Sequence, residues 1–338
     1  MDVVNLEKQL AGFIYELETE DRLVRVGLKD KLESEKIYKK YQSLFTKETL
    51  EDLKAEIKKL SGEKKDILER IFFTTAGSFI GLNTASVSDF ITTYFSQAKV
   101  NIGSEKIPYY EIAPRVAKEK IFEKRELLDD ATLPVKEKIN PKQVELLKSE
   151  IKLIKDLGFS GYLDYFSKGK KVNYANFYKV VLKIEKATRK IWQRQMSEVS
   201  VELLGRPFKN IRSCHLLYLR SLSMFDNFYP KEKVVWAFEQ VSADLGVGDL
   251  LSKITVDAAD RPKKNPRAVC YWPKPPSEIH LVIKPIGGEQ DFEAMLHEGG
   301  HALHGASIYP KLSYSLKTLA HSNALTEAYA FVLESLVF

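Results

Sequence analysis

The sequence predicts a mainly α-helical fold with a small β-sheet beside one histidine-bearing helix. Apolar residues recur at helical spacing through about the first 250 residues of the 338-residue chain. Near residue 257 the composition becomes proline-rich and polar, and the β-branched segment IHLVIKPI (279–286) follows. Three of the six histidines then fall within HEGGHALH (297–304). We divide the chain into a helical region, 1–205, and a second region, 206–338, that carries the histidine helix.

Composition excludes several classes of protein. Hydrophobic residues make up 44% and charged residues 29%, which is typical of a globular protein. The net charge of +6 is small, and its cations alternate with acids, so no basic stripe predicts nucleic-acid binding. Cys214 and Cys270 lack a CxxC spacing, and we expect both to be reduced. The N-terminus lacks the basic start of a signal peptide, and no apolar window reaches membrane-spanning length. We therefore expect a cytoplasmic protein with no nucleic-acid or membrane partner.

Helices are predicted throughout the first region and just beyond it. In the segment 141–158, Pro141 suits a first helical turn and Gly158 suits the end of a helix. A long helix is predicted over 173–205, and a shorter one over 234–246.

The second region is expected to contain two strands followed by two helices. The strands lie within 267–286, from RAVCYW to IHLVIKPI. A glycine turn follows, and Asp291 is expected to cap a helix over about 291–305. A last helix begins near residue 323.

His297 and His301 are four residues apart, so a helix places both rings on one face about one turn from each other. There they can share one tetrahedral zinc ion, which imidazole nitrogens approach to about 2.0–2.1 Å. Glu298 lies between them and can accept a proton from an activated water, as in the HExxH arrangement. The sequence therefore predicts one zinc ion per chain.

The third protein ligand is expected downstream. A histidine in the HExxHxxGxxH manner would fall at position 307, which is Ser307, so that class is excluded. Glu327, in an otherwise apolar helix, is the best-placed carboxylate, and Glu334 on the same face is expected to support the ligands rather than bind the ion. We expect His304 to support the site in the same way, with plain packing as the alternative.

Two neighbouring glycines interrupt the helix between the histidines. Gly299 and Gly300 each cost about 1 kcal/mol relative to alanine inside a helix. We expect their missing side chains to let the helix of Glu327 approach closely.

The other three histidines are less informative. We expect His215 and His280 to be structural, and His321 could reach the site from the loop before Glu327.

These residues resemble the thimet oligopeptidase and oligopeptidase F family of zinc metallopeptidases. The resemblance covers roughly 255–338 and rests on HEGGHALH, on Glu327 and Glu334, and on DAADRPKKNPRAVCYW and IHLVIKPIGGEQDFEAMLHE upstream. It implies a zincin-like helical shell around a deep channel, with residues 1–205 as one wall and short peptides as substrates.

The resemblance also implies roles for individual residues. His297, His301 and Glu327 would bind Zn²⁺, and Glu298 would be the general base. The strand bearing the substrate-binding residues would pair with the peptide backbone; these residues are His280, Leu281, Val282 and Ile283.

The sequence departs from the family pattern at two places. Ala324 stands where the family commonly has an acidic residue. The family also places oxyanion-stabilising tyrosines and a histidine well beyond the third ligand, whereas this sequence ends at Phe338. We therefore expect an N-terminal portion of a longer enzyme.

Two other readings stay open. A zinc carboxypeptidase of the HExxH type has a similar motif but tends to continue with Tyr-Glu-Gln, where this sequence has His304, Gly305 and Ala306. The chain could also be a catalytically incomplete, peptide-binding fragment. The intact Glu298 argues against a relic site.

Overall fold

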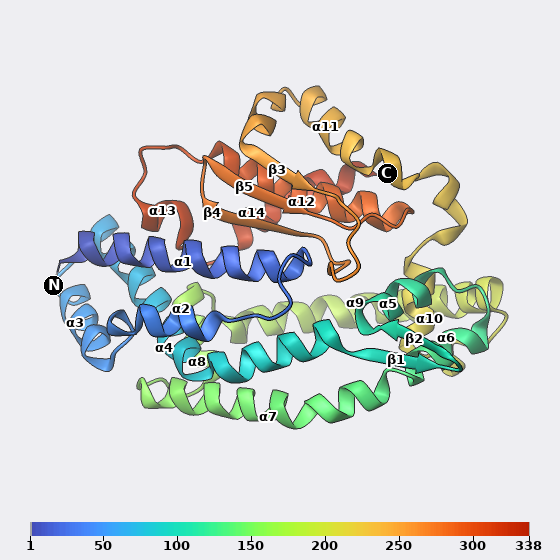
Figure 1. The fold of residues 1–338 in the computed structure, drawn as a ribbon, viewed down its shortest axis with the longest axis horizontal. Coiled ribbons are helices and arrows are strands. Elements are labelled where there is room, and N and C mark those ends of the chain that lie inside the picture. Colours follow the sequence, from blue (N-terminus) through green and yellow to red (C-terminus); the bar gives the residue numbers. More distant parts are fainter. Residues whose placement is uncertain (1, 338) are drawn as a thin grey trace.

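The computed structural model describes residues 2–337, to which every structural statement below refers. The fold is mainly helical with two small sheets (Figure 1). The helices are α1 (Val3–Arg25), α2 (Ser34–Lys40), α3 (Lys47–Ile57), α4 (Gly62–Gln97), α5 (Tyr109–Lys118), α6 (Phe122–Asp130), α7 (Leu133–Asp156), α8 (Tyr162–Lys170), α9 (Tyr174–Leu204), α10 (Ser213–Arg220), α11 (Val234–Asp244), α12 (Glu289–Ser307), α13 (Tyr314–Thr318) and α14 (Ala324–Glu334). The strands are β1 (Lys99–Ile102), β2 (Glu105–Pro108), β3 (Ile254–Asp257), β4 (Val269–Lys274) and β5 (Glu278–Val282). None of these helices is both long and apolar enough to cross a membrane.

The three-stranded sheet has the order β3-β5-β4, with β5 parallel to β3 and antiparallel to β4. One face packs against α12, where Ile279 and Leu281 share a buried cluster with Met295. On the other face, Val26 at the end of α1 packs against Val282. The sheet therefore lies between α12 and the end of the first helix, as Figure 1 shows.

The first helices form a separate hydrophobic core. Leu10 and Phe13 of α1 pack with Ile71 of α4 and Ile154 of α7. Leu319, from the segment between α13 and α14, lies in the same cluster. The segment that leads to Glu327 is thus anchored in the core of the N-terminal helices.

Several predicted elements are present, with differences at the start of α7 and in the strands. The helices expected at 173–205 and 234–246 correspond to α9 and α11. Pro141, expected in a first turn, lies inside α7, because the buried Val135 and Ile139 extend the helix on its N-terminal side. Strands β1, β2 and β3 were not predicted.

Asp291 does not cap α12, which begins two residues earlier, at Glu289. Its carboxylate instead accepts hydrogen bonds from the backbone N–H groups of Ile286 (2.6 Å) and Gly287 (2.5 Å). Asp291 therefore fixes the glycine turn that leads into the helix.

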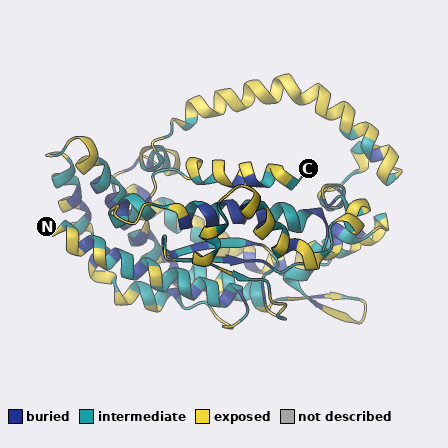
Figure 2. Cartoon of the chain, turned by 90° about the horizontal axis from the view of Figure 1, so that it is seen from above, coloured by how far each residue is buried: buried dark blue, intermediate teal, exposed yellow. Residues whose placement is uncertain are grey.

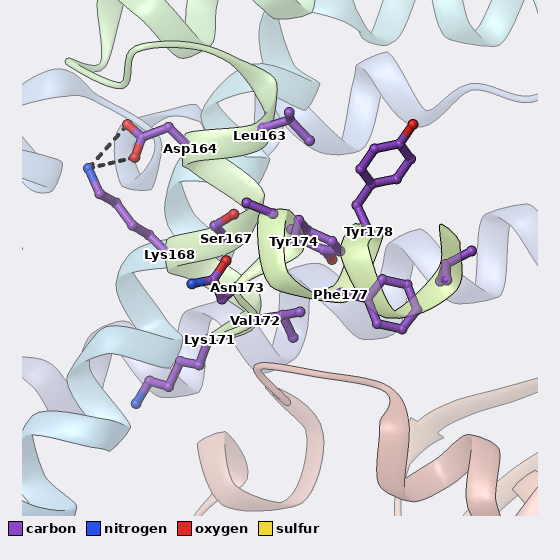
Figure 3. A pocket seen from close by; sticks show the side chains of 12 residues that line it. Leu163, Asp164, Ser167, Lys168, Lys171, Val172, Asn173, Tyr174, Phe177 and Tyr178 are labelled. Carbon is purple, nitrogen blue, oxygen red and sulfur yellow. Dashed lines mark hydrogen bonds and ion pairs between the residues drawn. The ribbon is translucent and has the colours of Figure 1, made fainter. Parts of the chain in front are cut away.

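Helix α9 stands apart from the rest of the molecule and is exposed along nearly its whole length (Figure 2). Apolar side chains such as Phe177, Ile184 and Trp192 are 50–58% exposed. A cavity of about 1050 Å³ lies where α8 meets α9, and Figure 3 shows its largely apolar lining. Its lining includes none of the predicted site residues.

Candidate metal centre

Helices α12 and α14 pack closely because Gly300 has no side chain. A Cβ atom at Gly300 would lie 2.6 Å from both the Cα of Ala330 and the carbonyl oxygen of Tyr329. The expectation of a close helix approach is therefore confirmed for Gly300. It is wrong for Gly299, whose added Cβ would meet the ring of Phe238 in α11 at 2.5 Å.

This packing brings His297, His301 and Glu327 together. Their ligand atoms all lie within 4.8 Å of one another. The Oε2 atom of Glu327 is 3.6 Å from Nε2 of His297 and 3.7 Å from Nε2 of His301. Ligands about 2.0–2.1 Å from a tetrahedral zinc ion lie about 3.3 Å apart, so the three residues fit the ion with small adjustments.

The remaining nitrogen of each histidine has a partner of its own. Nδ1 of His297 lies 2.6 Å from Oε2 of Glu334. Nδ1 of His301 lies 2.8 Å from Oγ1 of Thr326. Such partners fix the ring orientation and the tautomer, and here they leave both Nε2 atoms facing Glu327.

Thr326 was not among the residues predicted from the sequence, where the only departure noted beside Glu327 was Ala324 in place of an acidic residue. The spacing of Thr326 from His301 matches no recognised motif, and a hydroxyl residue next to a predicted ligand does not by itself predict a hydrogen bond to a histidine. Its contact depends on how α14 crosses α12, so the structure was needed to find it.

The environment favours a neutral His301. Burial lowers the pKa of His301, and the nearby carboxylates of Glu298 and Glu327 oppose this shift. A neutral imidazole is the form that binds a metal ion.

Glu298 lies on the side of α12 that faces β4. Burial, followed by the Glu298 charge, raises the pKa of the Cys270 thiol well above its usual value. Burial lowers the pKa of His301 and the Glu298 charge raises it, so the Glu298 carboxylate is near both Cys270 of β4 and His301. This is a suitable place for a general base acting on a substrate at the metal site.

A carboxylate from the first region also lies near β4 and was not predicted. Burial, together with the charge of Asp21, raises the pKa of Glu18 to about 7, against the opposing backbone N–H of Trp272. The hydroxyl of Tyr271 donates to Asp21 at 2.5 Å. Helix α1 thus lines the same strand that Glu298 faces on the other side.

His304 is held by packing and not by a contact to a ligand. Its ring stacks on Tyr329 at 4.6 Å and meets the edge of Trp272 at 5.1 Å. Its Nδ1 atom is buried without a hydrogen-bond partner. The alternative of plain packing therefore describes His304 better than a supporting role.

The other histidines lie in contacts of their own. Nδ1 of His215 accepts from Nε of the buried Arg125 (3.0 Å), and His280 contacts Glu278 (3.0 Å). His321 does not reach the ligands, because it contacts Asp66 (3.1 Å) and the carbonyl of Gly169.

His321, Asp66 and Glu69 form a second group with metal-ligand spacing. Lys171 bridges Asp66 and Glu69, and Arg70 also pairs with Asp66. These cations already neutralise both carboxylates, so the group is a salt-bridge network.

The expected substrate strand is β5, and the structure contradicts that role. β5 is hydrogen-bonded to β3 on one side and to β4 on the other. Leu281, Val282 and Ile283 are at most 1% exposed. Strand order depends on residues far apart in the sequence, and it makes β5 a central strand without a free edge.

Comparisons with known proteins agree on the fold alone. No family model and no curated protein matches the sequence. A solved structure of a candidate oligoendopeptidase F from Bacillus anthracis is similar, with a TM-score of 0.59 and 15% identity. The match covers 95% of this chain and 59% of that one, so this chain spans less than two thirds of its length. The likeness shows that the two chains share a mainly helical fold with small sheets.

Proposed function

We propose that the chain is a zinc-dependent peptidase that hydrolyses internal bonds of short peptides. The observation that carries the proposal is the pair of Nε2 atoms, of His297 and His301, facing Oε2 of Glu327 at 3.6 and 3.7 Å. The fold likeness to a candidate oligoendopeptidase F supports the same reaction class. Residues 1–205 would form one wall of the peptide channel, and the ion would be held by His297, His301 and Glu327.

When bound, zinc supplies Lewis acidity for the scissile carbonyl and lowers the pKa of the attacking water. Glu298 takes the proton of that water and delivers it to the leaving amine. Glu334 and Thr326 hold the two histidine rings in the orientation that the ligands need. The proposal leaves out strand addition to β5, whose two edges are occupied.

Metal analysis and peptide hydrolysis test the proposal together. We expect about one equivalent of zinc after dialysis. Glu298→Gln should keep that zinc while hydrolysis of an internally quenched peptide falls by about 10²–10⁴. Unchanged turnover in Glu298→Gln, or no zinc in the wild type, would contradict it.

A zinc carboxypeptidase remains the alternative reaction for the same residues. Mass spectrometry of the products separates the two, because single C-terminal amino acids would identify a carboxypeptidase and paired internal fragments an endopeptidase.

A further inference from the structure

A cavity of about 640 Å³ lies beside the start of β4. Its lining comes from the end of α1, from α5, from the first turn of α7, from α10 and from the loop 265–267. Three cationic side chains line it, namely Arg25, Lys136 and Arg267, against one carboxylate, Asp129. Its floor is apolar, and hydroxyl groups of two tyrosines, a threonine and a serine complete the lining.

The positive charge of this cavity is only partly neutralised from within. Asp129 lies 3.7 Å from Lys136 and is shared with Arg212, which lies outside the lining, at 3.3 Å. Nε of Arg25 lies 4.0 Å from Asp21, which is outside the lining, whereas Nη1 of Arg25 is buried and has no hydrogen-bond partner. Because a buried guanidinium N–H without an acceptor is costly, the cavity is suited to an anionic group that accepts from Arg25.

The loop that lines the cavity leads directly into strand β4. The N–H of Asn265 donates to the carbonyl of Arg25 at 2.9 Å, which ties the loop to α1. Arg267 precedes Cys270 by three residues, so their Cα atoms are at most about 11 Å apart. Cys270 in turn lies beside Glu298, the proposed general base. The cavity therefore lies beside the start of β4, which is an edge strand of the three-stranded sheet.

The cavity places cationic side chains beside the start of β4. Glu18 lies toward Trp272 and Asp21 bonds to Tyr271, whereas Arg25 lies at the cavity beside the start of the strand. A peptide has a positive amino end and a negative carboxyl end. The cationic cavity suits the carboxyl end, and a peptide that lies along β4 with this end in the cavity runs antiparallel to the strand.

We propose that this cavity binds the C-terminal α-carboxylate of the peptide substrate. The inference rests on the proposed peptidase function and names the class of substrate, short peptides with a free carboxyl end. Arg25 and Arg267 hold the carboxylate, and Arg25 offers the planar fork that suits it.

Binding measurements on the Glu298→Gln variant test this without relying on turnover. The probes are a fluorescent hexapeptide with a free carboxyl end and the same peptide with a C-terminal amide. We expect the free acid to bind about tenfold or more tighter, as for one charge-assisted contact. Adding Arg25→Gln should remove that difference, and adding Arg25→Lys should restore part of it. Arg22→Gln, on the same helix but outside the cavity lining, is the matched control and should keep the difference.

Three outcomes would overturn the assignment. One is equal binding of acid and amide, and another is a difference that survives Arg25→Gln. The third is that an amidated peptide ending in aspartate binds as tightly as the free acid, which would mean that the cavity binds a side-chain carboxylate equally well. Any of these leaves the peptidase proposal intact if the wild-type chain still cleaves peptides. Conversely, a wild-type chain that hydrolyses no peptide but still binds the free acid more tightly would contradict the proposed peptidase function and leave the carboxylate site standing.

Discussion

Replacement of Gly300 by alanine should weaken zinc binding more than it weakens folding. The added Cβ would lie 2.6 Å from backbone atoms of Tyr329 and Ala330, whereas ordinary contact begins at 3.4 Å. The difference, 3.4 minus 2.6, requires α12 and α14 to separate by about 0.8 Å. Metal–ligand distances tolerate only about 0.2 Å, so Glu327 would no longer complete the site well. We expect zinc affinity to fall by at least about tenfold, as for loss of a supporting contact.

The fold should tolerate the same change better. Overpacking costs about 1–3 kcal/mol, and the gain in helix propensity returns about 1 kcal/mol. Chelator competition gives the zinc affinity, and urea unfolding of the zinc-free protein gives the stability. Gly299→Ala is the matched control, because its Cβ meets Phe238 in α11 and leaves α14 in place. Zinc affinity within twofold of the wild type in Gly300→Ala would refute the reasoning.

Three further predictions concern the site and α1. Glu327→Ala should lose most of the zinc on dialysis, and full occupancy in that variant would remove Glu327 from the ligand set. Thr326→Val and Glu334→Gln should each lower zinc affinity by about 10–100-fold, because valine cannot hydrogen-bond to His301 and glutamine lacks the negative charge beside His297. Thr326→Ser should keep the affinity, and equal affinity in Thr326→Val would show that the hydroxyl has no positioning role. The pKa of Glu18, raised from 4.5 to about 7, means that its contribution to stability is complete below pH 4.5 and is lost as the pH rises through 7. The loss amounts to about 3 kcal/mol, so urea unfolding of Glu18→Gln should vary less over this pH range than that of the wild type, and identical pH profiles would contradict the buried position.

The residues of the candidate site were predictable where local spacing decides their position. A four-residue interval puts His297 and His301 on one helix face whatever surrounds them. The seven-residue interval from Glu327 to Glu334 acts in the same way on α14. Glu327 could therefore be assigned to the histidine pair by chemistry, since two histidines require a third ligand.

Positions set by distant parts of the chain were not predictable. The sequence treats Gly299 and Gly300 as equivalent, but only Gly300 faces α14, while Gly299 faces Phe238. The β-branched pattern of IHLVIKPI predicts a strand but not its neighbours, and β5 proved to be central. Pro141 suits a first helical turn by local preference, yet the burial of Val135 extends α7 on its N-terminal side.

Because α9 is isolated, its local unfolding should cost less free energy than that of the packed helices. Almost nothing packs against the middle of this helix, so local propensity and its two ends hold it, with Asn173 as N-cap and Gly205 as C-cap. Single helices in water lie close to the balance between helix and coil. The amides of α9 should therefore exchange with solvent through local opening at small free energy, while those of α12 require opening of a buried core. Local unfolding of α9 should therefore leave the helix that carries His297 and His301 intact.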